Sequence, residues 1–235
     1  MFYGSRDESR DMARSGALAA CMTKVYWWMA FALVVSGLCA WIVGDSEGLA
    51  QIFIGNQLVF FGLILAEIGL VLGISAGINK LSAATASALF ILYAALNGIT
   101  LSVVFLVYTT TSVAQVFGIT AATFAVMATV GTVTKKDLTS FGNLLFMALI
   151  GLILASLVNM FWANDTLYWI CTYAGVLIFI GLTAYDAQKI KKMYLATDPD
   201  DTERIGKIAV IGALELYLDF VNLFLYLLRI FGKRR

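Results

Sequence analysis

Four acidic residues lie within long apolar stretches of the sequence: Glu67, Asp186, Glu215 and Asp219. An ionisable side chain is costly inside a bilayer, so each of these acids is a hypothesis of function. Glu215, Asp219 and Asn222 follow the spacing i, i+4 and i+7, which places them on one face of a helix. Because such a polar stripe cannot face lipid cheaply, we expect this helix to be central in a helix bundle.

Two of these acids allow a simpler interpretation. Glu67 could be a hydrogen-bonding group between two helices, and Glu215 could face a water-filled vestibule without a specific role. Both alternatives stay open at this point. We therefore treat Glu67, Glu215 and Asn222 as supporting polar residues.

Several kinds of chemistry are excluded or disfavoured by the residues that are absent. The chain contains no histidine, which excludes a His-based metal site, a His proton relay and a His-containing catalytic triad. Its three cysteines, Cys21, Cys39 and Cys171, form no CxxC pair and are expected as small buried residues in helices. An intramembrane hydrolase could use two aspartates, but the Gly-x-Gly-Asp run that it would need is absent. We expect no enzymatic activity, no tightly bound cofactor and no nucleic-acid partner.

The composition indicates that these residues are positioned by helices in a lipid bilayer. Of the 235 residues, 61% are hydrophobic and 13% are charged, against about 45–50% and about 25% in soluble domains. A helix that crosses a core of ~30 Å needs ~20 mostly apolar residues. The segments that qualify are 25–44, 57–78, 83–107, 112–133, 141–163, 167–187 and 207–231. The sequence thus predicts an all-α integral membrane protein with seven transmembrane helices in one domain, 25–235, after an N-terminal segment, 1–24.

The distribution of Lys and Arg among the connectors predicts the orientation. Basic residues occur in the N-terminal segment and after the second, fourth and sixth predicted helices, whereas the alternate connectors have none. The longest connector, about 188–206, is the richest in them. We therefore expect a cytoplasmic N-terminus. Basic residues at the C-terminus break this rule, so the last helix either spans the membrane or re-enters it, and we favour a span.

Small residues predict where helices approach closely. Gly69, Gly73 and Gly77 repeat every four residues, which leaves one stripe of that helix without side chains. Gly151 and Ala155 form a weaker version. Such stripes let another helix come near the backbone, so we expect helix packing there.

Two segments that carry aspartates resemble the signature helices of the Bax inhibitor-1 family, also called the transmembrane Bax inhibitor motif family. They are GLTAYDAQKIKKM, from Gly181 to Met193, and LYLDFVNLFLYLLRIFG, from Leu216 to Gly232. The stretches NGITLSVVF, from Asn97, and TKKDLTSFGNLLFMALIG, from Thr134, are similar to the bacterial branch of that family. The resemblance extends from the second to the seventh predicted helix, and the N-terminal segment matches less distinctively.

The resemblance implies a seven-helix fold in the bacterial inner membrane, with the last helix surrounded by the others. It also implies a pH-sensitive calcium leak, with calcium as the permeating ion. One aspartate on the sixth helix and one on the seventh form a proton-sharing pair in this family, and the matching positions are Asp186 and Asp219. Family members are associated with stress protection, and some bacterial ones with a membrane-bound protease.

The chemistry of such a pair follows from electrostatics. Two carboxylates in contact at low dielectric cannot both ionise cheaply, so they bind protons as a unit. A shared proton would hold their helices together, and its loss would leave two like charges that repel each other or attract a cation. Oxygen ligands suit calcium. Asp186 and Asp219 alone would make a weak, transient calcium site, which fits permeation better than storage.

One feature of the family pattern is not matched clearly. In some members a basic residue on the second helix latches the aspartate pair, and the sole candidate here is Lys80, at the edge of its span. A different class of function also stays open: a non-transporting membrane protein that binds and modulates another membrane complex, such as a membrane-bound protease. Buried acids that face each other would favour the leak over this alternative.

Overall fold

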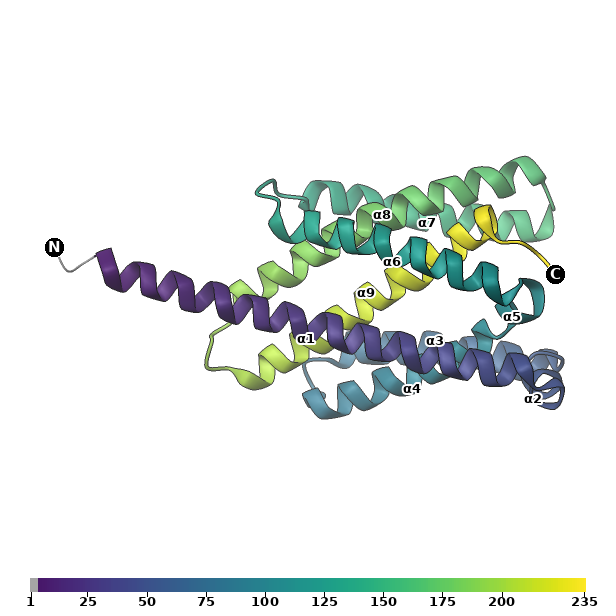
Figure 1. Cartoon of the computed structure of the whole chain (residues 1–235), viewed down its shortest axis with the longest axis horizontal. Helices are drawn as coiled ribbons and strands as arrows, with labels where there is room; N and C mark the ends of the chain where they lie inside the picture. The colour runs from purple at the N-terminus through teal and green to yellow at the C-terminus, as the bar shows by residue number, and fades with distance from the viewer. Residues whose placement is uncertain (1–3) are drawn as a thin grey trace.

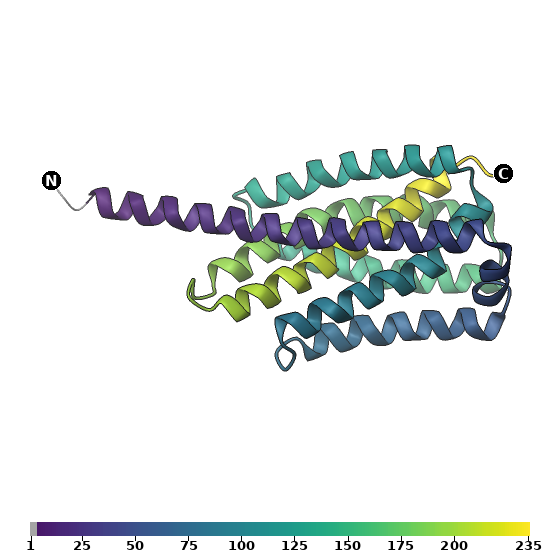
Figure 2. The same cartoon turned by 60° about the horizontal axis from the view of Figure 1, so that its bottom comes forward.

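A computed structural model describes residues 4–235, which form nine helices. Their bounds are α1 (Gly4–Asp45), α2 (Glu47–Phe53), α3 (Gln57–Gly77), α4 (Ala83–Leu101), α5 (Val103–Val107), α6 (Thr110–Val133), α7 (Thr139–Phe161), α8 (Asp165–Leu195) and α9 (Thr202–Phe231). Within these residues the only β-pairing is an isolated bridge between Tyr108 and Arg234. The long helices run side by side in an elongated bundle (Figures 1 and 2).

The prediction of seven membrane-spanning helices is confirmed. Over the described residues, seven helical stretches are long and apolar enough to cross a bilayer. One of these spans combines α4 and α5, which are separated at Ser102, whose hydroxyl donates to the carbonyl of Ile99 (2.7 Å). Hydroxyl side chains that bond back to the helix backbone in this way bend helices. The short helix α2 lies in the first connector, where the hydroxyl of Ser46 caps its N-terminus.

Three helices extend beyond their predicted bounds by more than two residues. α1 already begins at Gly4, so the part of the N-terminal segment that the structure describes continues the first span as helix. α8 runs on to Leu195, which places Lys189, Lys191 and Lys192 on a helix and not in the predicted connector. α9 is one continuous helix of 30 residues. At 1.5 Å per residue it is ~45 Å long, which is enough to span, and the start of α1 and the C-terminus lie at opposite ends of the bundle (Figure 1).

The last helix has the most buried surface among the long helices. α9 packs against α8, α1, α6 and α4, and its buried side chains include Leu214, Tyr217 and Leu223. By contrast, α3, which is described over its whole length, has one fully buried residue, Ile74, and packs mainly on α4. α7 packs mainly on α8. Because α3 and α7 hardly touch α9, the expectation that all other helices surround it stays a prediction.

The predicted glycine stripe does not form a helix contact. A Cβ atom added at Gly69 or Gly73 would meet nothing within 4 Å, and one at Gly77 would meet only the side chain of Leu81 at 3.4 Å. Gly151 also faces open space. The packing prediction for these glycines was therefore wrong. The stripe lies on the outer side of α3, because that helix contacts the bundle through another face.

Close helix contacts occur at other glycines. A Cβ at Gly131 of α6 would lie 2.0 Å from the carbonyl oxygen of Ala184 on α8. On α4, Gly98 meets the backbone of Ser36 on α1, where the nearest approach would be 2.5 Å. Both contacts are with backbone atoms, so no rotamer change can relieve them. These glycines allow α6 to approach α8 and α4 to approach α1.

The polar end of α8 fastens the turn between α6 and α7. The side-chain amide of Gln188 donates to the carbonyl of Lys136 and accepts from the backbone N–H of Leu138, both at 2.8 Å. Lys192 forms an ion pair with Asp137 in the same turn. The C-terminal end of α8 therefore clamps the turn between α6 and α7 through two hydrogen bonds and an ion pair. The same helix carries Asp186 closer to its middle.

Candidate functional site

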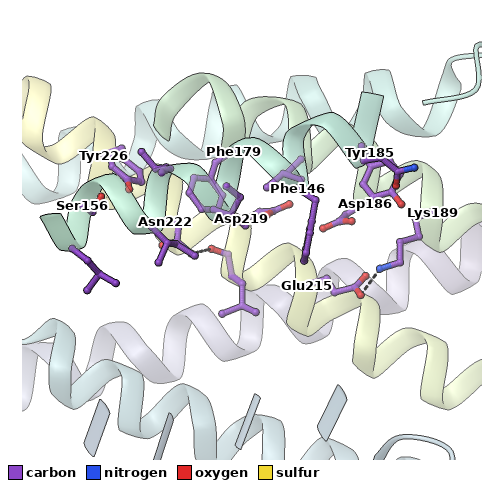
Figure 3. Close-up of a pocket in the computed structure, with 18 of the residues that line it drawn as sticks. Phe146, Ser156, Phe179, Tyr185, Asp186, Lys189, Glu215, Asp219, Asn222 and Tyr226 are labelled. Atoms are coloured by element: carbon purple, nitrogen blue, oxygen red, sulfur yellow. Dashed lines mark hydrogen bonds and ion pairs between the residues drawn. The ribbon is translucent and has the colours of Figure 1, made fainter. Parts of the chain in front are cut away.

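A crevice of about 720 Å³ separates α7 from α9, with α8 at its back. Every side chain that lines it comes from these three helices, and about half of the lining residues are apolar. The polar members are Asn143, Ser156, Tyr185, Asp186, Lys189, Glu215, Asp219, Asn222, Tyr226 and Arg229. Figure 3 shows that the acids from α8 and α9 gather in the middle of this crevice.

Asp186 and Asp219 face each other across the contact between α8 and α9 (Figure 3). Each carboxyl group lies within electrostatic reach of the other. Asp219 is buried, with 4% of its surface exposed, whereas Asp186 is half-buried. The packing of α8 against α9 brings these two positions together.

Two carboxylate oxygens in the crevice have no donor among the described residues. They are Oδ2 of Asp219 and Oε2 of Glu215, and both are buried. The other oxygen of Glu215, Oε1, forms an ion pair with Lys189 at 2.6 Å. A buried acceptor without a donor costs about 1–3 kcal/mol, and more when it is charged. The site therefore favours a proton, a cation or a donor group at these two atoms.

Lys189 is the cation that the sequence analysis missed. It was assigned to a connector, but it lies on α8 one turn after Asp186, which is the i+3 position on the same face. Lys80, the candidate latch, lies exposed in the turn between α3 and α4 and does not line the crevice. The predicted helix 167–187 ended before Lys189. A longer predicted helix would have placed Lys189 at the i+3 position from Asp186 and so on the same face.

The far end of the crevice carries a second cation. The guanidinium of Arg229 lies over the rings of Tyr168 and Tyr226, at 5.5 and 5.1 Å from their centroids. Tyr226 stacks on Phe179, and its ring occupies the space that a side chain at Gly175 would need. The aromatic rings thus hold Arg229 at the exposed rim, as cation–π contacts do.

Glu67 belongs to a separate polar centre on the other side of α9. Its carboxylate accepts from the amide of Asn97 (2.9 Å) and the hydroxyl of Thr100 (2.8 Å) on α4. The hydroxyl of Tyr217 on α9 donates to Oδ1 of Asn97 (2.9 Å), and it lies 2.6 Å from the hydroxyl of Ser36 on α1. This network joins α1, α3, α4 and α9, as a hydrogen-bonding group between helices would.

The structure therefore sorts the six residues singled out in the sequence into different places. Asp186, Glu215, Asp219 and Asn222 line one crevice. Asn222 lies one turn beyond Asp219 and uses its amide to donate to the carbonyl of Leu218 (2.8 Å). Glu67 and Lys80 lie elsewhere. The sequence predicted no hydrogen-bonding role for Asn97, Tyr217 or Ser36, because a polar residue of these types within a span does not indicate which helix it will contact.

Comparison with known proteins places this chain among bacterial membrane proteins. A family model described as inhibitor of apoptosis-promoting Bax1 matches residues 18–235. The inner membrane protein YbhL of Escherichia coli K12 is 48% identical over 230 residues, which are 98% of each chain. An uncharacterized protein of Borreliella burgdorferi is 47% identical over 214 residues, 91% of this chain and 92% of that one. One from Rickettsia prowazekii is 39% identical over 229 residues, covering 97% and 95%.

Proposed function

This chain belongs to the Bax inhibitor-1 family, and on that premise we propose that it is a pH-sensitive calcium leak. Its seven apolar spans and its similarity to an inner membrane protein identify it as a multi-pass protein of the inner membrane. We further propose that Asp186 and Asp219 share a proton that keeps the leak closed. The N-terminus lies in the cytoplasm in this proposal, in agreement with the excess of Lys and Arg at that end.

One observation carries the proposal: two carboxyl groups from different helices face each other at the back of a crevice (Figure 3). Two charges so close, with Asp219 buried, repel strongly when both groups ionise. A proton shared between them removes that repulsion and links α8 to α9. Loss of the proton would push the helices apart, or draw in a divalent cation that screens both charges.

The cation would be held by oxygen ligands alone. Oδ2 of Asp219 is unpartnered and is therefore free to bind it, and Oε2 of Glu215 offers a further oxygen in the same crevice. Calcium takes 6–8 oxygen ligands, so two or three carboxylate oxygens leave most of its shell to water. Such incomplete coordination releases the ion quickly, which suits passage through the membrane.

Calcium flux into proteoliposomes at several pH values tests this function. We expect wild-type flux to rise as the pH rises through the range in which the pair loses its shared proton. Asp186→Asn and Asp219→Asn each remove one of the two repelling charges, so each should flatten or shift the pH dependence. The double variant should add little to either single one, because residues that act as a unit are not additive.

The control is Asp165→Asn, which removes an exposed acid at the start of α8, outside the crevice. Its pH dependence should match that of the wild type. Additive shifts in the double variant would show that the two acids act independently. Wild-type liposomes without calcium flux at any pH would overturn the leak and leave the alternative, a protein that binds and modulates another membrane complex.

A further inference from the structure

We propose that the crevice between α7 and α9 is also a binding site for a lipophilic primary ammonium ion that enters from the bilayer. The ligand class is an alkyl chain that carries a protonated amine. This site shares the unpartnered oxygens of Asp219 and Glu215 with the proposed calcium site, but it does not require calcium passage, because it needs only the walls and these oxygens of the crevice.

The first argument is the opening of the crevice. α7 packs on α8 and hardly touches α9, so the gap between them opens on the side of the bundle and not at its end. Side chains of α7 on its rim are exposed: Phe146 is 60% exposed and Met160 69%. Both belong to a membrane-spanning helix, so this opening faces the acyl chains of the lipid. An amphiphile can enter it sideways without leaving the membrane.

The second argument is the apolar wall. Phe146, Leu149, Leu152 and Ile153 of α7 lie opposite Leu218 of α9, and all of them line the crevice. A volume of about 720 Å³ is in the range of small-molecule pockets, which are mostly apolar with a few placed polar groups. An alkyl chain that moves from the lipid into the crevice keeps apolar neighbours along these side chains, so its entry exposes no apolar surface to water. A bare hydrated cation cannot use this wall.

The third argument is the demand for donors at the back of the crevice. Oδ2 of Asp219 and Oε2 of Glu215 are buried, and neither receives a hydrogen bond from any described residue. The two cations that line the crevice are already engaged, Lys189 with Oε1 of Glu215 and Arg229 over two tyrosine rings. A primary ammonium group has three N–H donors. Charge-assisted hydrogen bonds from it to carboxylates are about twice as strong as neutral ones.

These three features select one chemistry. A neutral alcohol lacks the charge, and a quaternary ammonium ion carries charge but has no N–H to donate. A small inorganic cation satisfies the carboxylates but leaves the apolar wall unoccupied. The headgroup of phosphatidylethanolamine and a free alkylamine both present a primary ammonium on an apolar body. We therefore name this shared group, and the experiment distinguishes its two sources.

The test uses the full chain in nanodiscs of phosphatidylcholine, a lipid without N–H donors, in calcium-free buffer. Radiolabelled dodecylamine is the probe, with unlabelled dodecyltrimethylammonium as the competitor that lacks N–H groups. We expect saturable binding of one dodecylamine per chain, and the competitor should displace it at least about tenfold less well than unlabelled dodecylamine. Asp219→Asn should weaken binding by a similar factor, whereas Asp165→Asn should leave it unchanged.

A second pair of variants tests the wall without changing any charge. Ile153 lines the crevice and Ile150 on the same helix does not, although both are about half exposed (52% and 50%). Ile153→Trp should fill the crevice and abolish saturable binding, while Ile150→Trp should retain it. Gel filtration confirms that each variant is folded and monodisperse before binding is measured.

Two outcomes would overturn the proposal. One is uptake of dodecylamine that does not saturate and is equal in wild type, Asp219→Asn and Ile153→Trp, which is partition into lipid. The other is displacement by the trimethylammonium compound as readily as by the primary amine.

In a parallel arm, phosphatidylethanolamine replaces part of the phosphatidylcholine. Loss of the label there identifies the lipid headgroup as the source, and retention identifies a free amine; either result supports the site. Calcium flux plays no part in this binding experiment, so the amine site is tested separately from the proposed calcium leak.

Discussion

At the scale of single residues, α9 carries two polar groups that point to opposite sides of the helix. Asp219 lies in the crevice toward α8, and Tyr217, two residues earlier, joins Asn97 and Ser36 in the network with Glu67. Polar side chains are costly in a span unless they are hydrogen-bonded. Tyr217 is satisfied by its neighbours, whereas Asp219 keeps one free oxygen, so the first serves packing and the second is available for a ligand.

Replacing Tyr217 with Phe tests the packing role of this network. Tyr217 is fully buried, and the change removes its hydrogen bond to Asn97 and its contact with Ser36 while keeping the ring. We expect a loss of about 1–3 kcal/mol in the free energy of unfolding, because buried partners are left unsatisfied. Chemical denaturation in detergent measures it. Tyr173→Phe, at a side chain that is 54% exposed, is the matched control and should change little. Equal stability of the two variants would contradict a structural role for the network.

A second residue-scale prediction concerns acid stability. The hydrogen bond from the Lys192 ammonium, together with those from Thr139, holds the pKa of Asp137 well below its ordinary value. A folded-state pKa below the unfolded one stabilises the protein above the unfolded pKa, about 3.9, and this contribution is lost as the pH falls further. Asp137→Asn should therefore lower the melting temperature near neutral pH and reduce its fall below about pH 4.

The effect should be small because Asp137 is exposed and solvent screens its ion pair. Melting temperatures of wild type and variant are compared between neutral and acidic pH in the same detergent. Glu47→Gln removes an exposed acid at the start of α2 and serves as the control. Parallel melting curves for wild type and Asp137→Asn at every pH would rule out this contribution.

At the scale of elements, the helices differ in how many other helices they pack against. α8 and α9 each contact several helices, whereas α3 packs mainly on α4 and α7 mainly on α8. Glycines allow close backbone contacts at Gly131, between α6 and α8, and at Gly98, between α4 and α1. Of the two outer helices, α7 has a close contact at a glycine, because Gly142 lies against the ring of Tyr185 on α8, whereas a Cβ atom at Gly73 of α3 would meet nothing within 4 Å. If the proposed leak involves movement of a helix, α3 and α7 have the fewest neighbours to lose among the long helices.

Two glycines on α6 offer a matched test of this packing. A Cβ at Gly131 would clash with the carbonyl of Ala184, whereas one at Gly118 would meet nothing within 4 Å. Gly131→Ala should cost about 1–3 kcal/mol by overpacking. Gly118→Ala should be neutral or stabilise the helix by up to ~1 kcal/mol, because alanine has the higher helix propensity. Unfolding in detergent measures both, and similar values for the two variants would show that α6 does not approach α8 this closely.

At the scale of the whole molecule, the bundle has two chemically different ends. One end carries the connector between α8 and α9 and the clamped turn around Asp137. At the other end, the C-terminal residues are held against the turn between α5 and α6. There the backbone N–H of Thr109 donates to the carbonyl of Lys233, and that of Arg235 donates to the carbonyl of Val107, both at 3.0 Å. These bonds hold the basic C-terminal residues at the end of the bundle that the predicted orientation places outside the cytoplasm.

Labelling of single cysteines tests this topology in intact cells. In a variant with the three native cysteines replaced, a cysteine at Pro199 should resist an impermeant thiol reagent, because the connector between α8 and α9 is expected in the cytoplasm. A cysteine at Arg235 should be labelled, since α9 crosses the bundle once as a continuous helix. Permeabilised cells control for reactivity at both sites. Labelling at Pro199 together with protection at Arg235 would invert the orientation, and protection at both would require a re-entrant α9.

The sequence by itself determined the seven spans and the polar stripe of the last helix. Apolar length and helical spacing are local properties, so Glu215, Asp219 and Asn222 were placed on one face correctly. Only the tertiary structure decided which residues meet. In the structure, Glu67 lies apart from Asp186 and Asp219, and Lys189 contacts Glu215. Gly73 faces outward, whereas Gly131 lies at a helix contact. In lipid, where most faces of a helix are apolar, the face that meets a neighbour depends on packing between segments distant in sequence, which no local pattern records.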